Sequence, residues 1–179
     1  MTRFLPKGVY MKKPNNQKET INVISYDPQW PHIYETEAAS IQQALGNNFI
    51  AIHHFGSTSV PELAAKPKID ILAVVKSFSL LNIPALEQLG FEYRGEIIST
   101  GRYLAKGKLR IHLHLFEEGN PLITRNLTFR DWLRTHPDDR EAYAQLKQRL
   151  ASHHTDGMAY CHAKTDFITQ IIEKALQNK

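Results

Sequence analysis

The pattern of hydrophobic and polar residues predicts a mixed β-sheet with helices packed against it. Apolar segments with the length and composition of strands occupy residues 21–26, 49–55, 69–76 and 109–116. The apolar residues of 31–45 instead recur at helical spacing, directly before a glycine, which indicates a helix. We therefore expect the strands to form one sheet, with 49–55, 69–76 and 109–116 as neighbours.

The second half of the chain adds a hairpin and then becomes helical. Residues 101–106 and 109–116 flank Gly107, which favours an antiparallel hairpin. A short helical pattern covers 83–90, and we expect helices over 127–176. This order of elements predicts an α/β fold in the α+β range, with a helical C-terminal part.

Composition divides the chain into a basic arm and one globular unit. A length of 179 residues suits a single domain, because domains usually hold about 100–200 residues. Residues 1–20 contain five basic residues and one acidic residue, so they carry the whole net charge of +4. We expect 1–20 to be a flexible basic arm and 21–179 to be one domain. Since that domain is formally neutral, the composition does not favour binding to nucleic acid.

The cysteine count and the hydropathy indicate a cytoplasmic protein. Cys161 is the only cysteine, so no internal disulfide can form, which fits a reducing compartment. No apolar run approaches the roughly 18 residues of a transmembrane helix, and the N-terminus lacks the apolar core of a secretory signal. We expect no membrane association. Composition leaves the oligomeric state and any protein partner open.

Candidate chemistry begins at a turn of small residues between two expected strands. Gly56, Ser57, Thr58 and Ser59 precede an expected short helix, and such a turn can present backbone N–H groups to a phosphate. Lys66 adds a nearby cation. The same composition is also common in plain loops. Twelve residues separate Ser57 from Asp70, a lone carboxylate in the next apolar strand.

This arrangement resembles the nucleotidyltransferase signature, and the segment is similar to that of the GrpB family in particular. The positions that match the GrpB pattern in this segment are His54, Gly56, Ser57, Thr58, Val60, Pro61, Leu63, Lys66, Pro67 and Asp70. An upstream segment matches through Tyr26, Pro28, Trp30, Glu37, Leu45 and Gly46. The resemblance extends over residues 21–175 and implies a nucleotidyltransferase-like fold. Glu62, where the family has glycine, and Lys68 depart from it.

The resemblance also implies that the metal centre is incomplete. Nucleotidyltransferases hold two Mg²⁺ ions with an Asp-apolar-Asp strand, and here Leu72 takes the second position. Asp70, Leu72 and Val74 should share one face of the strand. Asp70 is therefore expected to bind a metal or to act as a base without its usual acidic partner.

Further candidates each have a structural alternative. His112 and His114 should point to one side of their strand and could complete a divalent metal site with Asp70, or they could simply form hydrogen bonds. In the expected last helix, Lys164 edges the apolar face, where its ammonium could meet a phosphate or a surface carboxylate. His54 would line the same cleft or be a core histidine.

Two charged candidates complete the set. Glu37 lies at the edge of the apolar stripe of 31–45, so it lines the cleft or forms a structural ion pair. Arg102 belongs to the cations of the hairpin, which hold phosphates or protect a sheet edge from aggregation.

Three functions follow from these expectations. The leading one is a nucleotide- or phosphometabolite-binding protein on a nucleotidyltransferase-like scaffold, with a metal-dependent nucleotidyl transfer limited by the incomplete two-metal site. One alternative is a non-catalytic binding or regulatory module that contacts a protein partner. Another is a metal-dependent phosphohydrolase that uses the same cleft.

Overall fold

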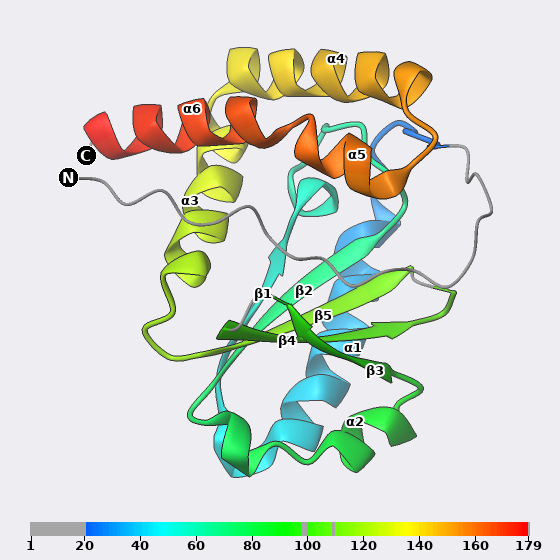
Figure 1. The fold of residues 1–179 in the computed structure, drawn as a ribbon, viewed down its shortest axis with the longest axis vertical. Helices are drawn as coiled ribbons and strands as arrows, with labels where there is room; N and C mark the ends of the chain where they lie inside the picture. The colour runs from blue at the N-terminus through cyan, green and yellow to red at the C-terminus, as the bar shows by residue number, and fades with distance from the viewer. Residues whose placement is uncertain (1–20, 98–99, 109, 179) are drawn as a thin grey trace.

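The computed structural model describes residues 21–97, 100–108 and 110–178, and the basic arm predicted at 1–20 lies outside them. In these described residues, one mixed five-stranded sheet is combined with six α-helices (Figure 1). The strands are β1 (Phe49–Phe55), β2 (Ile69–Val75), β3 (Glu92–Ile97), β4 (Gly101–Lys106) and β5 (Ile111–Glu117). The helices are α1 (Gln29–Leu45), α2 (Ile83–Gln88), α3 (Pro121–Thr135), α4 (Pro137–His153), α5 (Gly157–His162) and α6 (Thr165–Gln177).

The sheet has the order β1-β2-β5-β4-β3. β2 and β5 are parallel, and the other neighbouring pairs are antiparallel. The expected adjacency of β1, β2 and β5 is confirmed, as is the hairpin of β4 and β5. The strand expected at 21–26 is wrong, because its pairing with the rest of the described chain is limited to one bridge between Ile24 and Ala65.

Alternation along β2 divides its side chains between the two faces of the sheet. Ile69, Ile71, Ala73 and Val75 join the main core, to which α1 contributes Trp30, Ile41 and Leu45. On the opposite face, Leu72 and Val74 pack with Phe116 and with residues of α3. The sheet therefore has α1 on one side and α3 on the other, and Asp70 lies on the α3 side.

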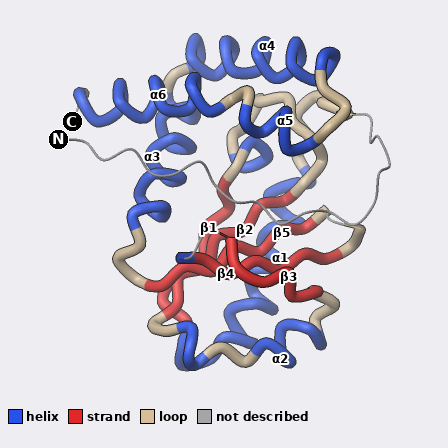
Figure 2. The backbone as a smooth tube through the Cα atoms, viewed as in Figure 1, coloured by secondary structure: helices blue, strands red, loops and turns tan. Residues whose placement is uncertain are grey.

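The C-terminal helices gather at one end of the sheet, as Figure 2 shows. Their side chains contribute to a second core. Leu133, Tyr143 and Ile171 come from α3, α4 and α6, and they pack with Val60 and Leu63 of the loop between β1 and β2. This core holds the loop beside the sheet edge. The short helix expected after the turn is absent from the described loop, where the helical turn is a 3₁₀ turn over Ser57–Ser59.

The helical region expected over 127–176 is confirmed in type but is interrupted. α3 begins at Pro121, and proline also begins α4, where its missing N–H needs no partner. Breaks at 154–156 and 163–164 separate α4, α5 and α6. None of the helices in the described part of the chain has the length and hydropathy of a membrane-spanning segment.

Candidate metal and phosphate site

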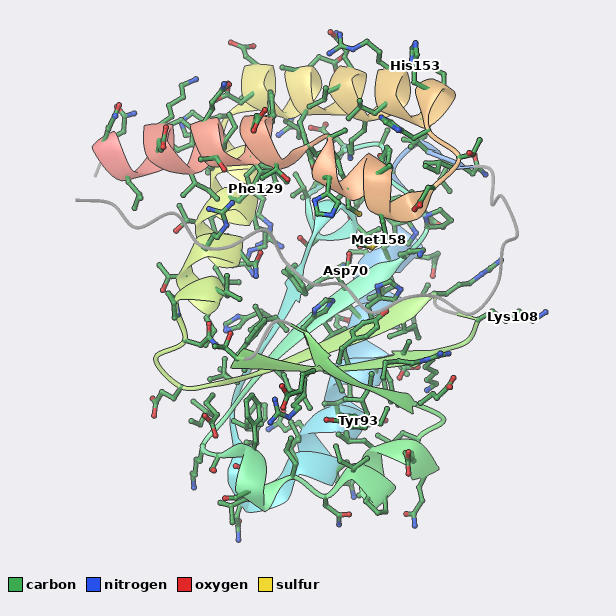
Figure 3. The ribbon with its side chains drawn as sticks, in the orientation of Figure 1. Asp70, Tyr93, Lys108, Phe129, His153 and Met158 are labelled. Carbon is green, nitrogen blue, oxygen red and sulfur yellow. The ribbon has the colours of Figure 1, made fainter. Side chains whose placement is uncertain are left out.

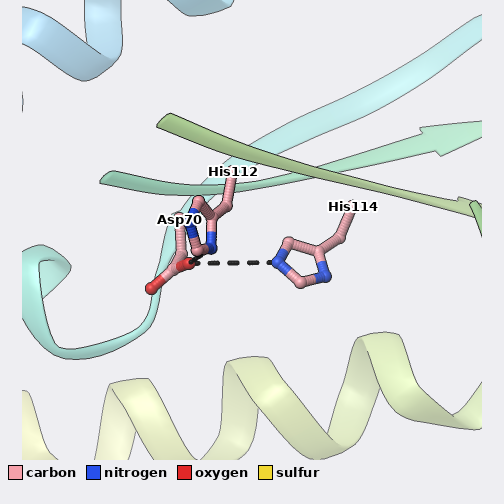
Figure 4. A group of neighbouring side chains, drawn as sticks. All are labelled: Asp70, His112 and His114. Carbon is pink, nitrogen blue, oxygen red and sulfur yellow. Dashed lines mark ion pairs between the residues drawn. The ribbon is translucent and has the colours of Figure 1, made fainter. Parts of the chain in front are cut away.

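The parallel pairing of β2 with β5 brings three expected metal ligands together. Asp70 pairs with His112, and Leu72 pairs with His114, so all three polar side chains project from the same face. His112 Nδ1 lies 3.3 Å and His114 Nε2 lies 3.9 Å from Asp70 Oδ1 (Figure 4). One ligand atom from each residue lies within 4.8 Å of the others. Leu72 is fully buried among apolar side chains, as the alternation requires.

The charge and spacing of this cluster fit one divalent metal ion. Burial raises the pKa of Asp70, but the neighbouring imidazoles of His112 and His114 outweigh burial and hold that pKa well below its usual range. The carboxylate is therefore ionised, as a metal ligand must be. Two ligands about 2.1 Å from one ion in tetrahedral geometry lie roughly 3.4 Å apart. The observed spacing needs only small side-chain movements to reach that value.

Tyr103 also belongs to this site. Its ring centre lies 5.4 Å from that of His112 and 5.2 Å from that of His114. Burial and the negative charge of Asp70 both raise the pKa of Tyr103, so its phenol stays protonated. Sequence reasoning missed Tyr103, because its position depends on the pairing of β4 with β5, which places it opposite His114.

The turn and the metal cluster meet at Gly56. Gly56 has a φ of +70°, a backbone conformation that favours glycine. A Cβ atom at this position would lie 2.5 Å from Asp70 Oδ2, well inside contact distance. Only glycine lets the turn pass this close to the carboxylate. In Figure 3, Asp70 lies on the sheet at the side of the molecule that carries α3, α5 and α6.

The hydroxyl groups of the turn are mostly committed within the protein. Thr58 Oγ1 donates to the carbonyl of Lys68 at 2.9 Å, and Ser59 Oγ donates to the carbonyl of Gly56 at 2.6 Å. Both side chains are buried. Ser57 forms a side-chain hydrogen bond with Tyr143 of α4. The hydroxyls of Thr58 and Ser59 therefore shape the loop, and they are poorly placed to donate to a ligand.

Two arginines of α3 donate hydrogen bonds to main-chain carbonyls on either side of the turn. Arg134 donates from Nε and Nη2 to the carbonyl of Ser59, at 3.0 and 2.7 Å. Arg130 donates to the carbonyl of His54 at 3.0 Å. These contacts fix the backbone on both sides of Gly56. Sequence reasoning missed them, since a helical arginine carries no signal of the loop it will reach.

Glu62 departs from the family pattern at a position where glycine has a physical reason. Its φ is +66°, which is strained for a residue with a Cβ atom. Its carboxylate accepts a hydrogen bond of 2.6 Å from Arg140 Nη2. This ion pair ties the loop to α4 and partly neutralises the negative charge that Glu62 brings near the turn.

The two candidate lysines converge on one aromatic ring. Lys164 Nζ lies 4.2 Å and Lys66 Nζ lies 5.5 Å from the centre of the Tyr160 ring. We expected Lys164 inside a continuous last helix. It lies instead at the break between α5 and α6. Burial lowers the pKa of Lys164 overall, against the opposing effect of the negative charge of Asp70. The lysines thus come from distant parts of the chain to one place.

His54 does not face the metal cluster. Its neighbour Phe55 pairs with Asp70 and contacts the His114 ring, so His54 points to the other face of the sheet. There it stacks on Tyr34, and its Nε2 lies 3.1 Å from Thr58 Oγ1. Burial is the main cause that lowers the pKa of His54 to about 4. The expectation of a cleft-lining histidine is wrong, and the core alternative holds.

Glu37 and Arg102 are also placed away from Asp70. Both Glu37 carboxylate oxygens accept hydrogen bonds of 2.8 Å from Lys106 Nζ, so the ion-pair alternative is the one observed. The Arg102 guanidinium lies 4.3 Å from the centre of the Phe78 ring and 3.2 Å from the Glu96 carboxylate. Both residues belong to the face that carries α1, because Lys106 and Arg102 alternate with Tyr103 along β4. The expectation that Glu37 and Arg102 line the cleft beside Asp70 is therefore wrong.

A cavity of about 460 Å³ opens between α3 and α6, and none of the candidate residues lines it. Trp132, Asp131 and Ala175 are among its lining residues. The candidate site therefore rests on side-chain chemistry at the sheet face, and this cavity is separate from it.

Comparison with known proteins identifies the family. The family model described as GrpB protein matches residues 20–174. UPF0157 protein BH1888 of Halalkalibacterium halodurans is 40% identical over 168 residues, which cover 91% of this chain and 85% of that protein. The crystal structure of conserved protein GrpB from Enterococcus faecalis has a TM-score of 0.80 at 38% identity, covering 88% of this chain and 98% of that one. The structure of a mutant of Cid1 poly(U) polymerase bound to MgATP has a TM-score of only 0.43, at 12% identity. The similarity covers 70% of this chain and 45% of that one. The chain therefore belongs to the GrpB protein family.

Proposed function

We propose that this protein binds a phosphorylated small molecule, a nucleotide in the leading case, together with one divalent metal ion. The observation that carries the proposal is the contact between the turn and the metal cluster at Gly56. The turn lies directly against the carboxylate of Asp70, where an added Cβ at Gly56 would be 2.5 Å from Oδ2. A phosphate at the turn would therefore be within reach of a metal held by Asp70, His112 and His114.

The donor set favours a transition metal ion over Mg²⁺. Mg²⁺ prefers oxygen ligands and octahedral geometry, whereas two imidazoles with one carboxylate suit Zn²⁺, Fe²⁺ or Mn²⁺. When bound, such an ion would neutralise phosphate charge and activate a phosphoryl group toward attack. Asp70 supplies the one negative charge among the three ligands, so the cluster is suited to a single cation.

The remaining residues supply binding and orientation. Lys66 and Lys164 bring positive charge to the side of the site formed by α5 and the loop. Arg130 and Arg134 hold the turn in place from α3. Because Leu72 replaces the second carboxylate, we expect weak or no nucleotidyl transfer with Mg²⁺. Robust Mg²⁺-dependent transfer of radiolabelled nucleotide, abolished by Asp70→Asn, would contradict this part of the proposal.

A metal-dependent phosphohydrolase is the second candidate. The composition of the cluster favours it, because three protein ligands leave further coordination positions open, as in catalytic metal sites. Hydrolysis needs no acceptor other than water. Release of inorganic phosphate in the presence of Mn²⁺ or Zn²⁺ would separate this activity from binding alone.

Thermal unfolding of the purified chain tests the proposal. Nucleotides, coenzyme A precursors and inorganic phosphates are each added with and without Mn²⁺, Zn²⁺ or Mg²⁺. The precursors are included because a dephospho-CoA kinase of Mycolicibacterium paratuberculosis is 28% identical over 185 residues, covering 87% of this chain and 45% of that protein. At a concentration 100-fold above Kd, a ligand stabilises the folded state by about 2.7 kcal/mol, which is readily detected.

Two variants make the result specific to the site. Asp70→Asn should remove the metal-dependent part of the stabilisation, whereas Asp138→Asn, in the exposed first turn of α4, should leave it unchanged. If no phosphorylated compound stabilises the wild-type chain under any metal condition, the proposal fails. A non-catalytic binding or regulatory module would then be the better account.

A further inference from the structure

Tyr160 carries a hydroxyl group that is buried and, among the residues that the structure describes, has no hydrogen-bond partner. The residue is 1% exposed, and it is the one buried residue of α5. A hydroxyl in this state is unfavourable, because it has lost its hydrogen bonds to water and gained none in the protein. Phenylalanine would fill the same space without this cost, so packing alone does not explain a tyrosine at this position.

The phenol lies beside both lysines of the proposed phosphate site. Lys164 Nζ is 4.2 Å and Lys66 Nζ is 5.5 Å from the centre of the Tyr160 ring. The start of α5 is also close to Lys66, since a Cβ atom built on Gly157 would be 3.9 Å from its Nζ. Lys66 belongs to the loop that meets Asp70 at the turn, and the charge of Asp70 reaches Lys164. Tyr160 is therefore joined by direct contacts to two residues of the proposed site.

The helix that carries Tyr160 is only lightly attached to the rest of the protein. Breaks at 154–156 and 163–164 separate α5 from α4 and α6, and the residues of α5 other than Tyr160 are half-buried or exposed. A helix of six residues has little stability of its own. Segments with few buried side chains open at a low cost in free energy. We therefore expect α5 to move more easily than the longer helices on either side of it.

We propose that the Tyr160 hydroxyl donates a hydrogen bond to the phosphate of the bound ligand, and that a movement of α5 brings the hydroxyl to it. This inference deepens the proposed function and rests on it, because it needs a phosphate beside Lys66 and Lys164. A phosphate oxygen is a strong acceptor, and an acceptor is what the hydroxyl lacks. Burial raises the pKa of Tyr160, so the phenol keeps the proton that it donates.

The pairing couples ligand binding to the position of α5. In the ligand-bound position the hydroxyl makes a charge-assisted hydrogen bond, whereas in the position that the structure describes it makes none. A phosphate therefore favours the bound position by the difference in interaction between the two. The result is a short helix that closes on the phosphate through one tyrosine.

The substitution Tyr160→Phe tests the inference, because it removes the hydroxyl and keeps the ring that contacts Lys164. Inorganic tripolyphosphate is titrated into the full chain in a calorimeter. The variant should bind it roughly tenfold or more weakly than the wild type, as expected for the loss of a hydrogen bond to a charged group. The midpoint of thermal unfolding without ligand should equal or exceed that of the wild type, because no hydrogen bond within the protein is lost.

Tyr34→Phe is the matched control. The Tyr34 hydroxyl donates to the carbonyl of Ile52 at 3.3 Å, and its ring stacks on His54, on the sheet face away from Asp70. Removing this hydroxyl should lower the unfolding midpoint and leave the affinity for tripolyphosphate unchanged. The two substitutions thus have opposite effects, which a general loss of packing at either tyrosine would not produce.

Hydrogen exchange of the wild type measures the movement of α5 directly. Bound tripolyphosphate should slow exchange of the amides of 157–163 by roughly tenfold, and Tyr160→Phe should lose most of this protection. Equal tripolyphosphate affinity in the wild type and Tyr160→Phe, a lower unfolding midpoint in that variant, or unchanged exchange over 157–163 would overturn the inference. A wild type that does not bind tripolyphosphate would overturn it too. The proposed function is judged separately by the nucleotide and metal screen, and it survives a failure here if that screen is positive.

Discussion

Gly56 is the residue on which the site geometry depends most. Its positive φ is shared with Gly46 at the end of α1, but only Gly56 lies against a functional side chain. A Cβ at Gly46 would meet nothing within 4 Å, whereas at Gly56 it would meet the Asp70 carboxylate. Substitutions at the two glycines therefore distinguish the effect of backbone strain alone from the effect of a clash with the metal ligand.

We expect Gly56→Ala to weaken metal binding by roughly tenfold or more, since displaced support of a metal ligand commonly has effects of that size. It should also lower the free energy of unfolding by at least about 2 kcal/mol, from strain and crowding together. Gly46→Ala should lower stability by about 1–3 kcal/mol and leave metal affinity unchanged. Calorimetric metal titration and urea unfolding measure both quantities. Equal metal affinities in the two variants would remove Gly56 from the site.

At the level of secondary-structure elements, α3 holds the turn in place through Arg134, and we call this pair of hydrogen bonds to the Ser59 carbonyl the clamp. Arg134 places two donors on one carbonyl of the 3₁₀ turn, which holds Gly56–Ser59 against the sheet edge. Arg134→Met keeps most of the packing but loses both hydrogen bonds. We expect amide hydrogen exchange at Ser57–Val60 to quicken by roughly tenfold, which corresponds to about 1.4 kcal/mol of local opening free energy.

Arg149→Met is the matched control for the clamp. Arg149 is an exposed arginine on α4, and its removal should leave exchange at the turn unchanged. If Arg134→Met also leaves exchange at Ser57–Val60 unchanged, the turn is held by its own hydrogen bonds and the clamp is not needed.

Hydrophobic alternation was sufficient to predict the central strands and the shared face of the metal cluster. A period of two placed Asp70 with Leu72, and His112 with His114, before any pairing was known. The strand at 21–26 was wrong because composition cannot tell a single bridge from a full ladder. Tyr103 and Arg134 could not be predicted, since each depends on which element lies opposite. Lys164 was placed in the wrong context because no proline or glycine marks the break before α6.

For the whole molecule, two buried basic groups shape the dependence of stability on pH. The pKa of His54 is about 4 in the folded state, below the ordinary value of 6.5. As pH falls from 6.5 to 4, the unfolded chain gains a proton that the folded chain does not bind, so stability falls. Lys147, with its pKa of about 7, acts in a separate window: stability rises as pH rises from about 7 toward its ordinary value of 10.5.

We therefore expect the free energy of unfolding to decrease by up to about 3 kcal/mol between pH 6.5 and pH 4 on account of His54. His54→Gln has no titrating ring at this position and should show a smaller decrease over the same range. Urea unfolding at several pH values measures the difference. Parallel profiles for the wild type and the variant would mean that His54 has the same pKa in the folded protein as in the unfolded chain.

The central claim is that Asp70, His112 and His114 hold one divalent metal ion, and metal titration tests it most directly. Metal-free protein is titrated with Mn²⁺ and with Zn²⁺ in a calorimeter, for the wild type, for His112→Ala combined with His114→Ala, and for His32→Ala on the exposed face of α1. The account predicts one ion per chain in the wild type and in His32→Ala, and loss of this binding in the double variant. Unchanged stoichiometry and affinity in the double variant, or no binding by the wild type, would contradict it.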